Sequence, residues 1–245
     1  MPLPSPFLSV VIPLFNEEKR LKNIKTVISY LSRKKISWEL ILVNDGSTDE
    51  TGEYIDQLKN KKIKTISYPV NRGKGYAIKQ GMLSASGEHR LFMDVDLATP
   101  IETFGEFIPL FGKYDCLIGT RKAKGAQVSI HQPWFRENLG KGFTFLSRVF
   151  LGVPVSDFTC GFKCFSAESA RAVFGLSLVC RWGFDAEILF LCQRLGYSIK
   201  EIPVAWKDDR RTRVKFPQDI FRSLNELFTI RLNANRGLYA YQKNR

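Results

Sequence analysis

The strongest constraint on the fold of this 245-residue chain is an alternation of short apolar runs with stretches of helical periodicity over its first 120 residues. The apolar runs are rich in β-branched residues and occupy residues 8–12, 40–43, 63–68, 90–93 and 116–119. Between them, apolar residues recur at three- and four-residue spacing, most clearly from Leu21 to Leu31 and again over 75–85. Buried strands separated by helices of this length predict an α/β fold with a mostly parallel sheet flanked by helices.

After residue 121 the alternation is less regular. The spacing predicts helices over 135–149, 185–195 and 220–236, the last an amphipathic C-terminal helix, and a strand over 199–204. The chain shows no internal repeat, low-complexity tract or clear linker, and single α/β domains of about 250 residues are common. We therefore expect one domain over residues 1–245, with halves at about 8–120 and 121–235.

Polar residues follow the ends of the expected strands, where ligands of parallel sheets bind. These residues are Asn16, Glu17, Asp45, Asp94, Asp96 and Arg121. Asp94 and Asp96 directly follow a buried run, so their carboxylates can meet one hard cation. Magnesium or manganese suits oxygen ligands and usually retains phosphate oxygens in its shell. The alternative is two aspartates that merely end a strand in solvent.

Two further loops have both a ligand-binding and a structural interpretation. Asp45 can accept hydrogen bonds from a base or ribose, or it can belong to a turn that leads into a helix capped by Ser47 and Glu50. The stretch 71–75 places glycines and two cations at a helix start, which attracts phosphate. It matches neither a Walker loop nor a dinucleotide fingerprint, so a plain turn is favoured there.

The net charge of +13 favours a polyanionic partner: nucleic acid, an anionic membrane surface or a phosphorylated substrate. No recognised nucleic-acid motif occurs, so we expect no nucleic-acid partner. Residues 119–150 mix six cations with aromatics, which suits a membrane interface or a solvated face over a core. In that segment Arg136, Lys141 and Arg148 surround apolar residues that predict a membrane-docking surface: Phe143, Phe145, Leu146, Val149, Phe150 and Leu151.

Localisation is predicted from two absences and from the cysteines. No run reaches the ~18 apolar residues of a membrane span, and the start lacks the pattern of a signal peptide. The five cysteines are scattered, which favours reduced thiols, and Cys160 and Cys164 lack partner ligands for zinc. We expect a cytoplasmic protein, peripheral on the cytoplasmic face of a membrane.

Four ordered motifs resemble those of glycosyltransferase family two, which has the GT-A (Rossmann-like) fold. They are Val11–Glu18, Val43–Ser47, Asn71–Gly75 and Asp94–Asp96. Three later strings, 119–121, 157–163 and 181–187, resemble the polyprenyl-phosphate branch of that family, and the last of them leans towards its dolichyl-phosphate β-glucosyltransferase members. The resemblance covers residues 8 to 235 and implies a nucleotide-sugar half followed by an acceptor half.

The resemblance also implies roles for individual residues. The donor-binding residues it implies are Pro13, Phe15, Glu17, Val43, Asp45, Asp94 and Val95, with Asp94 and Asp96 as metal ligands. Asp157 lies near the implied reaction centre, where it acts in the chemistry or forms a structural hydrogen bond. The cations implied to bind the acceptor phosphate or the donor are Arg121, Arg136, Arg211, Arg213 and Lys215.

This sequence departs from the family pattern at three places. Ala98 stands where mannose synthases often have a glutamine ligand, Phe15 replaces a usual tyrosine, and Val214 precedes Lys215 in place of serine. The resemblance implies a metal-dependent, inverting transfer of a hexose, with UDP-glucose favoured as donor and a polyprenyl phosphate as acceptor. The alternatives are GDP-mannose as donor, or a soluble or glycan acceptor.

Overall fold

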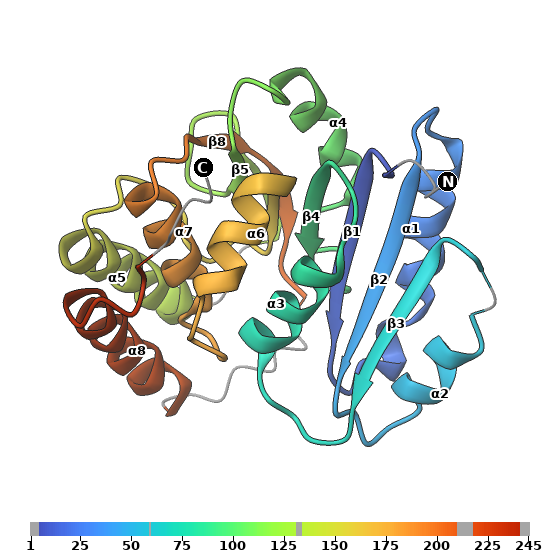
Figure 1. The fold of residues 1–245 in the computed structure, drawn as a ribbon, viewed down its shortest axis with the longest axis horizontal. Coiled ribbons are helices and arrows are strands. Elements are labelled where there is room, and N and C mark those ends of the chain that lie inside the picture. Colours follow the sequence, from blue (N-terminus) through green and yellow to red (C-terminus); the bar gives the residue numbers. More distant parts are fainter. Residues whose placement is uncertain (1–4, 59, 131–133, 210–217, 241–245) are drawn as a thin grey trace.

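The structure is a computed structural model that describes residues 5–58, 60–130, 134–209 and 218–240, apart from the side chains of residues 136, 219 and 220. Within these ranges a seven-stranded sheet forms the centre of the molecule (Figure 1). Its strands, in spatial order, are β3 (Ile63–Tyr68), β2 (Trp38–Asp45), β1 (Leu8–Leu14), β4 (His89–Met93), β7 (Phe162–Ser166), β5 (Cys116–Thr120) and β8 (Ile199–Pro203). A second, two-stranded sheet pairs β6 (Gln127–Ile130) with β9 (Ala205–Lys207).

Helices cover both faces of the large sheet. They are α1 (Lys22–Arg33), α2 (Thr51–Asp56), α3 (Lys74–Ser84), α4 (Phe104–Phe107), α5 (Trp134–Leu151), α6 (Ala167–Leu176), α7 (Phe184–Arg194) and α8 (Gln218–Asn235), with short 3-10 turns at Glu18–Arg20, Ile101–Thr103 and Ile108–Leu110. Alternate residues of β1 face opposite sides: Val11 packs with α3, α6 and α7, whereas Val10 and Ile12 pack with α1. The period-two pattern therefore builds two cores.

Strand direction determines which residues meet. β7 runs antiparallel to β4 and β5, while the other paired strands of the large sheet run parallel. Because β7 is reversed, the segment that precedes it, 157–161, reaches the same edge as the residues that follow β1, β2, β4 and β5. This carboxyl edge of the parallel strands gathers the polar positions expected from the sequence.

The α/β class, the mostly parallel sheet and the C-terminal helix are confirmed. Strand β7, helix α6 and the pair β6 and β9 were not predicted from the sequence. The predicted capping box is wrong, since α2 begins at Thr51, whose backbone N–H donates to Asp49 Oδ1 at 3.0 Å. Ser47 Oγ instead accepts from the Asn16 N–H at 2.9 Å. This hydrogen bond ties the turn after β1 to the turn after β2.

Candidate active site at the carboxyl edge of the sheet

Asp45, at the end of β2, holds the glycine loop that starts α3. Its Oδ1 accepts from the Arg72 N–H at 2.8 Å, and its Oδ2 accepts from the Gly73 N–H at 2.9 Å and from Asn71 Nδ2 at 2.8 Å. The tight turn requires Gly46, because φ is +69° and a Cβ there would lie 2.5 Å from the Asn71 nitrogen. Asp45 therefore has a structural role, because both of its carboxylate oxygens bind the loop that starts α3.

The turn after β1 is locked to the segment after β2. Asn16 has φ of +53°, and its Oδ1 accepts from the Thr48 N–H at 2.7 Å. Glu17 Oε2 lies 2.7 Å from Arg20 Nη1, and Arg20 Nε donates to Asp209 Oδ2 at 2.9 Å. Arg20 thus fixes Glu17 and brings the end of the 205–209 segment to the turn after β1.

Asp94 and Asp96 follow β4 at the middle of this edge. Asp94 Oδ1 forms an ion pair with Lys74 Nζ at 2.6 Å, yet about a third of its side chain (34 %) is exposed. Gly161 lies against it so closely that a Cβ would collide with the Asp94 carboxylate. Asp96 Oδ1 accepts from the Ala98 N–H at 2.9 Å. Burial, and then the charge of Asp94, raise the pKa of Asp96 to about 6.

These two carboxylates fit a hard divalent cation. Both are oxygen donors on one short turn, and Lys74 already supplies a positive charge to Asp94 there. Among the described residues, no group of three or more His, Cys, Asp or Glu side chains could hold a metal ion. Asp94 and Asp96 can therefore supply two protein ligands, which leaves the remaining positions to phosphate oxygens and water. Cys160 and Cys164 are buried free thiols and form no part of such a group.

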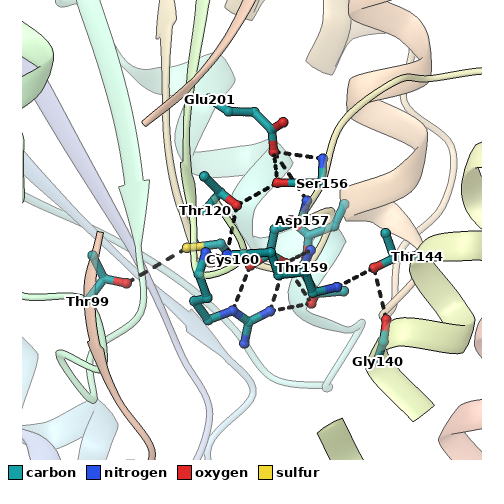
Figure 2. Close-up of polar contacts among 12 residues, drawn as sticks. Thr99, Thr120, Gly140, Thr144, Ser156, Asp157, Thr159, Cys160 and Glu201 are labelled. Atoms are coloured by element: carbon teal, nitrogen blue, oxygen red, sulfur yellow. Dashed lines mark hydrogen bonds and ion pairs between the residues drawn. The ribbon is translucent and has the colours of Figure 1, made fainter. Parts of the chain in front are cut away.

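Arg121 and Asp157 form a closed ion pair, and Figure 2 shows Asp157 among its polar neighbours. Arg121 Nε donates to Asp157 Oδ2 at 2.7 Å, Nη2 donates to Oδ1 at 2.8 Å, and the Arg121 N–H donates to Oδ2 at 3.1 Å. Burial opposes the charge on Asp157, which has no exposed surface, but the guanidinium outweighs it and holds the pKa of Asp157 well below its usual range. Asp157 is consequently an ion-pair partner and a poor proton acceptor.

A second layer of polar contacts fixes the turn that carries Asp157. Figure 2 shows Glu201 of β8 next to Ser156, and Ser156 next to Thr120 at the end of β5. Glu201 Oε1 accepts from Ser156 Oγ at 2.6 Å and from the Ser156 N–H at 2.8 Å, and the hydroxyls of Ser156 and Thr120 lie 2.7 Å apart. Neither Ser156 nor Glu201 was predicted as a site residue; strand β8 was expected, but its pairing with β5 was not.

A buried lysine was also missed. Lys163, in β7, has no exposed surface, and its Nζ donates to the Asp185 carboxylate and to the Cys160 carbonyl, the latter at 2.7 Å. Asp185 is in turn among the charges that act on Lys74. The only local signal was a lysine inside the apolar run 162–165. Basic and acidic groups therefore alternate from the interior to the edge, in the order Lys163, Asp185, Lys74 and Asp94.

The other predicted donor-side residues are placed unequally. Phe15 is exposed (36 %) and Pro13 is half-buried, so both can meet a ligand. The side chains of Val43 and Val95 are buried in the two cores, and their contact with the donor stays a prediction. The side chain of Arg136, and all of Arg211, Arg213 and Lys215, lie outside the described residues.

The predicted apolar surface on α5 also changes. Leu151 is buried and Phe143, Leu146 and Phe150 pack against the core, because this face of α5 covers α7 and α8. Phe145 and Val149 remain exposed, at 65 % and 64 %. The exposed apolar residues of the neighbouring helix α8 are Phe221, Phe228 and Leu232. Helices α5 and α8 contact each other and lie side by side (Figure 1), and we call these five exposed residues on them the α5–α8 face. Among helices within the described ranges, none has the length and apolarity needed to span a bilayer.

Comparison with known proteins places the chain in a family. Residues 9–174 match the model of Glycosyl transferase family 2. A dolichyl-phosphate beta-glucosyltransferase of Trichomonas vaginalis is 34 % identical over 224 residues, covering 85 % of this chain and 66 % of that protein. The human dolichyl-phosphate beta-glucosyltransferase is 31 % identical over 259 residues, covering 99 % of this chain and 80 % of that protein. The chain thus spans from about two thirds to four fifths of the length of these relatives.

A solved structure has the same fold. Glucosyl-3-phosphoglycerate synthase from Mycobacterium tuberculosis, in complex with uridine diphosphate, matches with a TM-score of 0.66 and 21 % identity over 98 % of this chain and 82 % of that chain. The fold is therefore GT-A-like, as the motifs implied. The chain is a glycosyltransferase that belongs to glycosyl transferase family 2 and is related to the dolichyl-phosphate β-glucosyltransferases.

Proposed function

We propose that this enzyme transfers glucose from UDP-glucose to a polyprenyl phosphate such as dolichyl phosphate, with inversion at the anomeric carbon. The observation that carries the proposal is the similarity to dolichyl-phosphate β-glucosyltransferases along 85 % to 99 % of the chain. In this reaction an acceptor phosphate oxygen forms the bond to the anomeric carbon. The bond from that carbon to the UDP oxygen breaks, and UDP leaves with the electron pair.

The open turn after β4 supports the donor side of the proposal. Asp94 and Asp96 would hold Mg²⁺ or Mn²⁺, which stabilises the charge that develops on the leaving diphosphate. Lys74, now paired with Asp94, stands at the start of α3 beside the glycine loop. Its ammonium and the exposed ring of Phe15 are the groups of this edge suited to a diphosphate and a base.

The closed ion pair fits a reaction that needs no strong general base. A phosphate monoester has a second pKa near ~6, so the acceptor is already a nucleophile at neutral pH. Asp157 is bound by Arg121 and is not suited to removing a proton. Its role in the proposal is to orient Arg121 at the edge where the two anionic substrates meet.

A donor and acceptor screen tests this proposal directly. Purified enzyme with Mn²⁺ or Mg²⁺ receives UDP-glucose or GDP-mannose, together with dolichyl phosphate, undecaprenyl phosphate or 3-phosphoglycerate. We expect glucose on the polyprenyl phosphates, and we expect EDTA to remove the activity. Faster transfer of mannose would overturn the donor assignment, and transfer only to 3-phosphoglycerate would overturn the acceptor assignment.

We further propose that the α5–α8 face docks on a membrane, where a lipid acceptor resides. The face exposes Phe145 and Val149 beside the cationic residues Lys141 and Arg148, a combination suited to anionic lipid. Co-sedimentation with vesicles that contain phosphatidylserine should fall for Phe145→Asp combined with Val149→Asp. Ile108→Asp, at an exposed apolar position on another element, is the matched control. Equal sedimentation of all three proteins would refute this docking surface.

A further inference from the structure

Lys122 is a cation at the active-site edge that no motif singled out. It follows Arg121 directly after β5, and its Nζ donates to Thr144 Oγ1 on α5 at 2.6 Å. Thr144 is buried and donates its own hydroxyl proton to the Gly140 carbonyl at 2.9 Å, so its oxygen is oriented to accept from the lysine. Lys122 as a whole is exposed, and two of its three N–H groups remain for a ligand.

Lys122 differs from neighbouring cations in having no ion-pair partner of its own among the described residues. Arg121 is paired with Asp157, and Lys141 lies 3.0 Å from Glu137. In the described part of the chain, no carboxylate lies within ion-pair distance of Lys122. Partial removal of the ammonium from water lowers the pKa of Lys122. The positive charges of Arg121, Arg148 and Lys141 lower it further, and the negative charge of Asp157 opposes them. Lys122, with two N–H groups left and other cations nearby, is therefore suited to bind an anion.

The position of Lys122 selects which anion. On one side, Arg121 contacts the 157–161 segment, and Gly161 at its end touches the Asp94 carboxylate of the donor turn. On the other side, Thr144 is followed by Phe145 of the α5–α8 face. Lys122 therefore stands between the donor turn and the surface proposed to meet lipid.

We propose that Lys122 binds the phosphate of a polyisoprenoid monophosphate acceptor, while Arg121 is held by Asp157 and contributes as a fixed neighbouring charge. The inference rests on the proposed function and names the residue that recognises its acceptor. An ammonium on a flexible stem can follow a phosphate between the bound and reacting positions, which a guanidinium clamped by a buried carboxylate cannot.

The test measures binding of farnesyl phosphate, inorganic phosphate and UDP by titration calorimetry, with Lys122→Met and Lys122→Arg. Lys124→Met, two residues along and also exposed, is the matched control. Loss of a charge-assisted contact should weaken farnesyl phosphate binding roughly 10- to 100-fold in Lys122→Met, with UDP binding within about twofold of wild type. Lys122→Arg should retain most of the affinity, and the KM for polyprenyl phosphate should change in parallel.

The outcomes separate this inference from the proposed function. Unchanged farnesyl phosphate affinity in a folded Lys122→Met variant overturns the inference, as does an equal loss for UDP. An equal loss for inorganic phosphate, without any preference of wild type for farnesyl phosphate, overturns the lipid assignment. Lysine-dependent binding of farnesyl phosphate without glucose transfer by wild type would instead count against the proposed function alone.

Discussion

Asp94 and Asp157 lie at the same edge of the sheet, each beside a cation, yet their surroundings differ. Asp157 has no exposed surface, and Arg121 binds it through Nε, Nη2 and its backbone N–H. Asp94 is about one third exposed and has one lysine contact. The first carboxylate is committed to the protein, whereas the second holds a counter-ion that a ligand can displace. An acidic residue at a strand end is thus a ligand site only where its own protein leaves it accessible.

The largest expected effect is on stability, at Asp157. Asp157→Ala leaves Arg121 as an uncompensated charge and should lower the free energy of unfolding by about 3–5 kcal/mol, measured by urea denaturation. Asp94→Ala, at the open site, should cost less than about 1 kcal/mol. Equal losses in the two variants would erase the distinction between the closed and open carboxylates.

Asp96→Ala should instead lower activity strongly and leave stability intact. We expect at least a hundredfold loss of glucosyl transfer, about 2.7 kcal/mol of transition-state stabilisation, because one of the two proposed protein ligands for the metal is removed. The thermal unfolding midpoint should equal or exceed that of wild type, since a half-buried carboxylate with a raised pKa is lost. Near-wild-type activity in this folded variant would exclude Asp96 from the metal site.

The raised pKa of Asp96 predicts a pH dependence of known sign. Its pKa of about 6 in the folded state exceeds the value of 3.8 for a free aspartate, so the folded state binds the proton more tightly. Metal-free stability should therefore fall as pH rises from about 4 to 6 and then level off. Mn²⁺ affinity should rise about tenfold per pH unit as pH increases towards 6, because the proton on Asp96 competes with the cation. Asp96→Asn should remove the stability slope; a slope that persists would assign it to another group.

The smallest effect should be a gain, at Lys74. Lys74→Met removes the internal counter-ion of Asp94, and Mn²⁺ affinity without nucleotide should rise about fivefold, measured by electron paramagnetic resonance of free Mn²⁺. Lys64→Met, which removes a lysine paired with Glu39 on another part of the sheet, is the control. Weaker Mn²⁺ binding in Lys74→Met would show that the lysine supports the metal instead of competing with it.

Features that depend on residues close together in the sequence could be predicted, whereas features that depend on distant residues could not. Asp94 and Asp96 could be found because a local apolar run ends there. The pairing of Arg121 with Asp157 spans 36 residues and depends on β7, which local periodicity did not reveal because Lys163 interrupts its apolar pattern. On α5, one helix face packs on the core and another is exposed, and apolar residues occupy both. Only tertiary packing distinguishes Leu151 from Phe145.

The reversed strand β7 also constrains the order in which the molecule can assemble. In the sheet, β5 pairs only with β7 and β8, both of which follow it in the chain, whereas β1, β2, β3 and β4 pair among themselves before β7 adds to β4. During synthesis the first four strands can therefore associate by residue 93, but residues 116–120 have no sheet partner until residues 162–166 emerge. The turn with Asp94 and Asp96 is built on strands that can form early, and the Arg121–Asp157 pair completes only when the late strand inserts. A nascent chain stopped near residue 150 would carry β5 as an unpaired apolar segment, the kind of exposed strand that chaperones bind.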